Sequence, residues 1–433
     1  MSRGKSNFLI PIVVILMVGA GWAMACGGGG GDSARVSSGD DDDAADPSLI
    51  GDDDDDGSDD DDDDAEDDDD SDDDDDDDDD DTDDDTDDDD TDDDDTGDDD
   101  EVEVDEVAFN IIDAEYSEGL DRAIIVSTKP TNALITLDLE AGTWTTISLS
   151  KAPLGVSVDP AGKLAAVNHG STISHVDISE QSIRDVYTPS ESVSDVVLTS
   201  KFIYAVPDSG EWTRMLAIRL SDGEEFTHTG DTDLRHQSVA KLARNDEWIY
   251  TADTDLKKTG FSKFDVDTES GVPAYVRSNP VYDTDDVVCG DFWYAFTGGW
   301  MITRCANVIA IDKSAGDDMK VVTKLEEAEI VKGMAVSPAS NQVVVLLDNG
   351  TEFDQRDSRL VGLSASGFHY EKDFELPEYD DGEDLYTIHG DYVFFVNDNH
   401  HNKFYVLGHV DETSGLNEEN TFRLMEFTLF EKK

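Results

Sequence analysis

Basic residues are scarce in this chain of 433 residues. Lysine and arginine together number 30 against 106 aspartates and glutamates, which gives a formal net charge of −76. A surface with this charge repels phosphate groups, and no stretch of the sequence gathers enough Lys or Arg to form a basic patch. Nucleic acids and anionic lipid headgroups are therefore not expected as partners. Cations and basic proteins remain candidate partners.

Short catalytic motifs are also missing. The sequence contains no G-x-S-x-G, H-E-x-x-H, C-x-x-C, Walker or G-x-G-x-x-G pattern. Because active sites can be assembled from distant segments, this absence does not exclude an enzyme. It favours a non-catalytic protein, for which we predict no catalytic residue and no bound cofactor.

Cysteine occurs only three times, and Cys26 stands apart from the other two. It follows an apolar run of 18 residues, Phe8–Ala25, which comes after a short basic start. This arrangement is typical of an export signal. It resembles the bacterial lipoprotein signal, in which small residues precede a cysteine that is lipidated, although Ala23 stands where that signal usually has leucine. We therefore predict a signal peptide at residues 1–25 and lipidation of Cys26.

Two other outcomes compete at the same segment. Cleavage after the "AMA" of residues 23–25 would release a soluble protein, and 18 apolar residues are just long enough to remain as a membrane anchor. The five glycines at 27–31 favour lipidation, because a flexible tether suits an anchored domain. All three outcomes export the rest of the chain.

Aspartate dominates the segment between Asp40 and Asp100. Of these 61 residues 44 are Asp, and none is Lys or Arg. Side chains about 3.5 Å apart repel each other within a screening length of about 8 Å, and there is little apolar surface to bury. We predict a disordered linker at 26–106 that acts as a spacer or a solubilising tract. Dense carboxylates also suit loose association with Ca²⁺ or a mineral surface.

A repeat of about 45 residues follows the acidic segment. Seven times an apolar run ends in a polar turn. The aligned positions are Asp138, Asp177, Arg219, Asp265, Asp312, Gly362 and Asp411. They are separated by 39, 42, 46, 47, 50 and 49 residues. Each unit reads as four short β-strands, and helical periodicity is absent. Four strands per unit at this period predict an all-β, seven-bladed β-propeller of antiparallel blades at residues 107–433.

Two hairpins suggest a family. "VSVDPAGKLAAV" (156–167) and "MAVSPASNQVVV" (334–345) resemble the first hairpin of YVTN-type and WD40-like bacterial propellers. The resemblance covers about residues 107–430 and implies the propeller architecture. It includes lactonase-like propellers, which hydrolyse cyclic esters, but none of their functional residues can be placed on this sequence. How the ring closes stays open, because both the first and the last unit hold four strands of their own.

Cys289 and Cys305 support two opposite interpretations. An even pair in an exported chain favours a disulfide. The strand pattern instead places Cys289 at the end of the first strand of its blade and Cys305 before the third, about 15–20 Å apart, which is too far for a bond. On balance we predict two separate thiols.

Two further groups are weak candidates for binding. Asp398, His400 and His401 lie together in a loop, where solvated turn residues are the simpler interpretation than metal ligands. Trp293 and the nearby "TGGW" (297–300) could provide an aromatic platform, although core packing also explains Trp293.

The order of these segments suggests a function. We predict a lipoprotein of the bacterial cell envelope, at the outer membrane or cell surface, that displays a non-catalytic propeller on an acidic spacer. Its partner would be an envelope or extracellular protein or a small ligand, and its only membrane contact would be the N-terminal lipid. The alternatives are a lactonase-like hydrolase that uses the central channel, and a protein that contacts calcium or mineral through its aspartates.

Overall fold

The structure is a computed structural model. It describes residues 102, 104–228, 234–243, 247–253, 260–266, 269–278, 288–295, 299–311, 317–325, 330–337, 340–348, 358–396, 403–417 and 420–429. These residues form 31 β-strands and one short 3₁₀ helix, η1 (Glu412–Ser414). The part of the chain described here contains no helix with the length and apolar character that crossing a bilayer requires.

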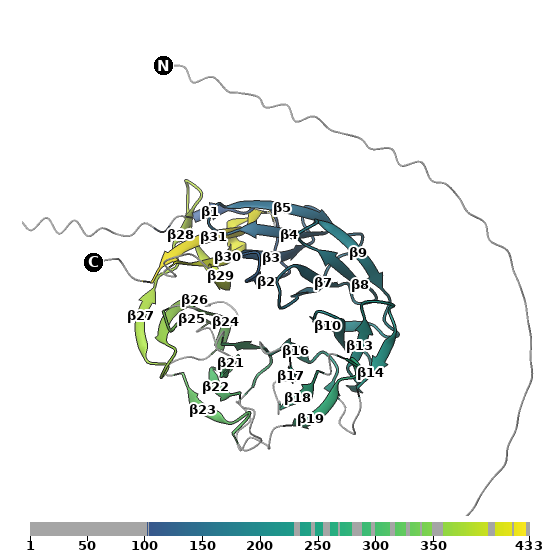
Figure 1. Cartoon of the computed structure of the whole chain (residues 1–433). Helices are drawn as coiled ribbons and strands as arrows, with labels where there is room; N and C mark the ends of the chain where they lie inside the picture. The colour runs from purple at the N-terminus through teal and green to yellow at the C-terminus, as the bar shows by residue number, and fades with distance from the viewer. Residues whose placement is uncertain are drawn as a thin grey trace, which may run out of the picture. The chain divides into compact units, whose positions relative to one another are not determined.

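Seven antiparallel sheets form a ring, which confirms the predicted seven-bladed β-propeller (Figure 1). Within each blade consecutive strands pair, and the first strand lies nearest the centre.

The first three blades occupy residues 113–227. Blade 1 contains β2 (Asp113–Ser117), β3 (Arg122–Ser127), β4 (Ala133–Asp138) and β5 (Thr143–Ser148). Blade 2 contains β6 (Gly155–Val158), β7 (Leu164–Asn168), β8 (Ile173–Asp177) and β9 (Ser182–Tyr187). Blade 3 contains β10 (Val193–Leu198), β11 (Phe202–Pro207), β13 (Leu216–Arg219) and β14 (Glu225–Thr227). A separate ribbon pairs β12 (Trp212–Thr213), which lies between β11 and β13 in the chain, with β15 (Leu234–Arg235), which follows blade 3.

The next three blades follow the same plan. Blade 4 contains β16 (Val239–Leu242), β17 (Trp248–Ala252), β18 (Phe261–Asp265) and β19 (Ala274–Ser278). Blade 5 contains β20 (Phe292–Tyr294), β21 (Trp300–Thr303), β22 (Asn307–Ala310) and β23 (Val321–Lys324). Blade 6 contains β24 (Ile330–Val336), β25 (Gln342–Asp348), β26 (Ser358–Ser364) and β27 (Tyr370–Phe374).

Blade 7 closes the ring with a strand from the other end of the chain. Its strands are β29 (Leu385–Phe395), β30 (Lys403–Val410), β31 (Phe422–Thr428) and, outermost, β1 (Val104–Glu106). Val104 pairs with Met425 and Glu106 with Arg423. The question that the sequence left open is thus answered by strand exchange, and the propeller includes residues N-terminal to the expected boundary at 107.

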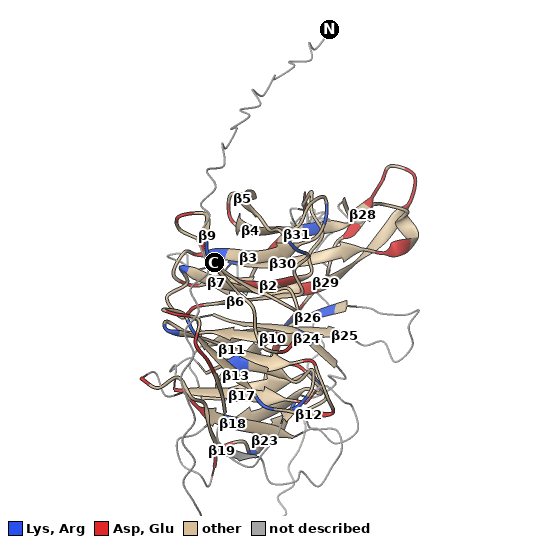
Figure 2. Ribbon diagram, turned by 90° about the vertical axis from the view of Figure 1, so that its right-hand side faces the viewer, with Lys and Arg blue, Asp and Glu red and all other residues tan. Residues whose placement is uncertain are grey.

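The first residues of β29 extend beyond blade 7. They pair with β28 (Glu378–Asp380), whereas Ile388–Phe395 pairs with β30. Figure 2 shows this hairpin projecting from the ring with acidic residues near its tip.

The hydrophobic core is divided into seven clusters, one at each contact between neighbouring blades. Each cluster combines side chains from two blades; for example, Ala123 and Ile125 of blade 1 pack with Leu407 and Leu424 of blade 7. Apolar residues on the central strands of every blade therefore face both neighbours, because successive side chains in a strand point to opposite faces. The inner strands of blades 1, 3, 4, 6 and 7 also carry charged residues at the centre of the ring, whereas that of blade 2 contributes only Val156 there.

Candidate functional site

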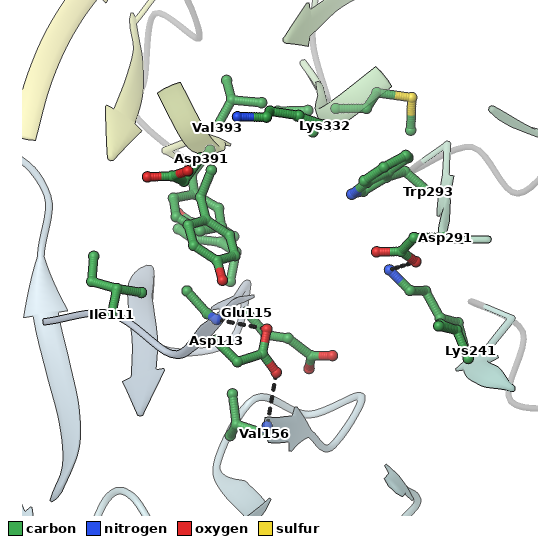
Figure 3. A pocket seen from close by; sticks show the side chains of 18 of the residues that line it. Ile111, Asp113, Glu115, Val156, Lys241, Asp291, Trp293, Lys332, Asp391 and Val393 are labelled. Carbon is green, nitrogen blue, oxygen red and sulfur yellow. Dashed lines mark hydrogen bonds and ion pairs between the residues drawn. The ribbon is translucent and has the colours of Figure 1, made fainter. Parts of the chain in front are cut away.

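A cavity of about 1290 Å³ occupies the centre of the ring. All seven first strands of the blades contribute to its wall. Figure 3 shows carboxylate, amine and aromatic side chains directed into this space from opposite blades. A cavity that gathers polar groups from distant segments is the usual place for a binding site, and we call it the central channel.

Asp113 and Glu115 form the part of the wall that belongs to blade 1. They are two residues apart on β2, so their side chains point to the same side of the strand. The Val156 amide donates a hydrogen bond to Asp113 Oδ2 at 2.9 Å, and the Val158 amide donates to Glu115 Oε2 at 2.7 Å. Both carboxylates thereby connect blade 1 to the inner strand of blade 2, and Figure 3 shows the bond between Asp113 and Val156.

Asp195 repeats this arrangement on blade 3. Its Oδ1 accepts a hydrogen bond from the Val196 amide at 2.8 Å, and its Oδ2 accepts one from the Ala240 amide of blade 4 at 2.7 Å. Asp113 also accepts from the next amide of its own strand, that of Ala114, at 2.9 Å. The same local geometry therefore recurs two blades apart.

These three carboxyl groups have raised pKa values. Burial in the channel wall is the main cause for each of them. It raises the pKa of Glu115 to about 8, with a further contribution from the Asp113 charge, and that of Asp195 to about 7. Hydrogen bonds from backbone amides oppose the shift without cancelling it. The channel therefore takes up protons near neutral pH.

Lys241, Asp291 and Trp293 form the opposite part of the wall, on blades 4 and 5. Lys241 Nζ lies 2.9 Å from Asp291 Oδ1 and 5.4 Å from the centre of the Trp293 ring. Burial lowers the pKa of Lys241, but the charge and hydrogen bond of Asp291 outweigh it, so the net pKa is raised. Trp293 lines the channel and also packs against the core between blades 5 and 6. It therefore combines the two roles considered for it, a place in a binding site and a place in the core.

Asp391, Tyr392 and His409 contribute the wall from blade 7. Asp391 Oδ2 and His409 Nδ1 lie 2.6 Å apart across neighbouring strands. Burial, followed by the Asp113 charge, raises the pKa of Tyr392 and keeps its hydroxyl protonated. The channel thus contains uncharged donors as well as carboxylates.

The described lining has more acidic than basic side chains. Its seven acids are Asp113, Glu115, Glu118, Asp195, Asp291, Asp391 and Glu412, and its three strong bases are Lys241, Arg304 and Lys332. Lys241 is already paired with Asp291, and Lys332 Nζ lies 3.7 Å from Asp348, outside the lining. A positively charged ligand therefore matches the charge of this lining better than a negatively charged ligand does.

The prediction of separate thiols was wrong. Cys289 and Cys305 form a disulfide, with their Cα atoms 5.5 Å apart. Cys289 precedes the first strand of blade 5, β20, instead of ending it, and Cys305 follows the second strand, β21. Because β20 and β21 are antiparallel, the start of one lies beside the end of the other.

The other predicted sites receive no structural description. Cys26, the acidic segment at 40–100, and Asp398, His400 and His401 lie outside the described residues. Within the described ranges, no group of three or more His, Cys, Asp or Glu side chains has a metal-binding arrangement.

The channel carboxylates were not among the predicted site residues. Asp113 and Asp195 are 82 residues, or two blades, apart, each near the start of the first strand of its blade. This recurrence lies in the first strands of the blades, whereas the repeat of about 45 residues is marked by the ends of the third strands.

Comparisons with known proteins identify a fold. No protein-family model matches the sequence, and no curated protein matches it. Among solved structures, Kuenenia stuttgartiensis hydrazine synthase is similar with a TM-score of 0.52 and 13% identity over 74% of this chain and 96% of that chain. The β-propeller domain of Myceliophteria thermophila Cps50 (Swd1) has a TM-score of 0.53 and 9% identity over 76% of this chain and 100% of that chain.

A chain in the mitotic checkpoint complex is similar at a TM-score of 0.50 and 10% identity, covering 76% of this chain and 95% of that one. At these identities the similarity concerns architecture alone. Residues 104–429 of this chain are therefore identified as a seven-bladed β-propeller whose central channel has more acidic than basic side chains.

Proposed function

We propose that this protein is a non-catalytic binding propeller whose central channel takes a ligand bearing an ammonium or guanidinium group. One observation carries the proposal: a cavity of about 1290 Å³ into which carboxylates and aromatic rings from separate blades converge. The ligand group is supplied by a small amine or by a basic side chain of a partner protein. The similar chain in the mitotic checkpoint complex belongs to a complex, which supports a protein partner.

The charge pattern of the channel favours the ammonium group. Within the described residues no Lys, Arg or His nitrogen lies within 4.0 Å of a carboxylate oxygen of Asp113, Glu115 or Asp195, and only backbone amides donate to them. The Lys241 charge favours the ionised form of all three, but burial outweighs it, so these carboxylates remain costly to ionise. A ligand cation removes this cost, and the Trp293 ring favours it further.

The amine cadaverine provides a direct test by isothermal titration calorimetry. We expect its affinity for the full chain to rise at least about tenfold from pH 6 to pH 9. The sign follows from the raised pKa values: Glu115, with a pKa of about 8, and Asp195, with a pKa of about 7, lose their protons over this range and gain negative charge. The amine resembles lysine, whose pKa of about 10.4 keeps it charged.

A substitution locates the binding. Glu115→Gln should weaken cadaverine binding at pH 9 by about 10–100-fold, because a hydrogen bond to a charged group contributes about 1.5–3 kcal/mol. The matched control is Glu269→Gln, at a side chain that is 86% exposed and outside the channel lining; it should leave the affinity unchanged. Equal affinities in all three proteins, or stronger binding at pH 6, would contradict the proposal.

Lactonase-like hydrolysis is a second candidate. Asp391, His409 and Arg304 all line the channel, whose cavity of about 1290 Å³ has room for a ligand. Turnover of a simple γ-lactone by the purified chain, lost in His409→Gln, would favour this candidate over the binding module.

We also propose that the propeller is displayed at a bacterial cell envelope by a lipid on Cys26 and by the acidic spacer. The sequence of the N-terminal segment supports this, as does the position of β1, which leads directly from the spacer into blade 7. Mass spectrometry of the mature protein should find Cys26 as the N-terminal residue, carrying a diacylglycerol. An N-terminus at Met1, or an unmodified Cys26, would contradict it.

A further inference from the structure

The inner strand of blade 5 is the shortest inner strand of the ring. This strand, β20, is only 3 residues long, whereas the other inner strands have 4 to 11. The strand makes three residue pairs with β21, from Phe292 with Thr303 to Tyr294 with Met301. One further backbone hydrogen bond lies at each end of this pairing, from Ala295 to Trp300 and from Arg304 to Asp291. A short ladder of this kind can open locally.

This short strand nevertheless carries central parts of the proposed site. Asp291 directly precedes it and binds Lys241, and Trp293 is its middle residue. Asp291 Oδ1 also accepts a hydrogen bond from the Phe292 amide at 2.7 Å, and the Arg304 amide donates to the Asp291 carbonyl at 2.9 Å. The position of the Lys241 ammonium therefore depends on where β20 lies.

The disulfide lies immediately beside these residues. Cys289 is two residues before Asp291, and Cys305 directly follows Arg304. Cys289 has φ of +55° and Gly290 has φ of +107°, a backbone region that residues other than glycine rarely adopt. Such a conformation persists where the surrounding structure fixes it, and Cys289 is covalently linked to Cys305.

We infer that Cys289 and Cys305 are positioning residues for the central channel: their disulfide holds β20 so that Asp291, Trp293 and, through Asp291, Lys241 keep their places in the wall. The inference rests on the proposed function for its effect on ligand binding. Reduction by a dithiol breaks the S–S bond, transfers two electrons and two protons to form two thiols, and oxidises the dithiol to its disulfide. The blade 5 wall then loosens while the ring stays folded.

Hydrogen exchange measured by mass spectrometry tests this in the full chain, purified in detergent. Three samples are compared: the oxidised protein, the protein reduced with dithiothreitol, and Cys289→Ser/Cys305→Ser. In the last two, amides in the peptide covering 291–295 should lose protection at least about tenfold. The peptide covering β6 and β7 (155–168) is the internal reference and should not change.

The ligand arm uses cadaverine. Its dissociation constant at pH 9 should rise about tenfold in the two disulfide-free samples, and reoxidation of the reduced protein should restore it. If the double variant does not fold, the reduced wild-type protein still answers the question. Unchanged protection at 291–295, or an equal loss across the whole ring, overturns the inference. Local loss of protection in a chain that binds no cadaverine even when oxidised refutes the proposed ligand and upholds the positioning role.

Discussion

Replacement of Asp318 by alanine is expected to lower the free energy of unfolding by about 3–5 kcal/mol. Asp318 Oδ2 lies 2.9 Å from Lys263 Nζ, and the two side chains are only 2% and 5% exposed. Removal of one member of a buried ion pair leaves the other charge in a low-dielectric environment, and this desolvation has no compensation. Urea unfolding followed by tryptophan fluorescence measures the change.

The surroundings of this pair explain why the effect should be large. The Tyr250 hydroxyl donates a hydrogen bond to Asp318 Oδ1 at 3.0 Å, and Lys263 Nζ lies 3.5 Å from the centre of the Trp248 ring. Lys263 and Tyr250 belong to blade 4, whereas Asp318 belongs to the segment before β23 of blade 5. The ion pair therefore links blade 4 to blade 5.

An exposed ion pair one residue away in the chain provides the control. Lys320 and Asp317 also approach to 2.8 Å, but their side chains are 61% and 68% exposed. Asp317→Ala should therefore change the free energy of unfolding by no more than about 1 kcal/mol. A combined Lys263→Met and Asp318→Leu replacement should recover much of the loss, since it removes both charges. If Asp317→Ala and Asp318→Ala have equal effects, the buried pair is not a major source of stability.

Replacement of Val104, Asp105 and Glu106 by Gly-Ser-Gly in the full chain should destabilise the propeller by about 2–4 kcal/mol. Val104 packs against the core between blades 6 and 7, and burying a valine contributes up to about 1.5–3 kcal/mol. The strand also pairs with Phe422–Thr428, and each backbone hydrogen bond adds about 0.5–1.5 kcal/mol. Glycine further disfavours the extended strand.

Urea unfolding and limited proteolysis both report on this change. Once β1 is lost, β31 becomes an unpaired edge, so cleavage should begin near blade 7. The same Gly-Ser-Gly replacement at 98–100 within the spacer is the control and should not affect stability. If the two replacements behave alike, closure of the ring does not depend on the pairing of β1 with β31.

The repeat was predictable because its signal is local. Asp138, Asp177, Arg219 and Asp265 were aligned as strand ends, and each is the last residue of the third strand of its blade. In each blade an apolar strand is followed within a few residues by a polar turn. The prediction failed at Cys289, where an apolar pattern continues although the backbone turns at Cys289 and Gly290 before β20 begins.

The candidate site was not predictable in the same way. Asp113 and Val156 are 43 residues apart, and Lys241 and Asp291 are 50 apart, yet each pair is in hydrogen-bonding contact. Whether a polar residue on a first strand faces the channel, a neighbouring blade or solvent depends on how far the blades rotate around the ring. A single blade contains no information about that rotation.

The sequence by itself determined the number of blades, their four-stranded plan and the acidic character of the chain, because strand alternation, turn residues and charge are properties of short segments. Only the tertiary structure decided the pairing of β1 with β31, the disulfide in blade 5 and the convergence of Glu115, Asp195 and Lys241 on one cavity. These features exist only when the ring closes, since closure brings together residues that the chain keeps tens to hundreds of positions apart.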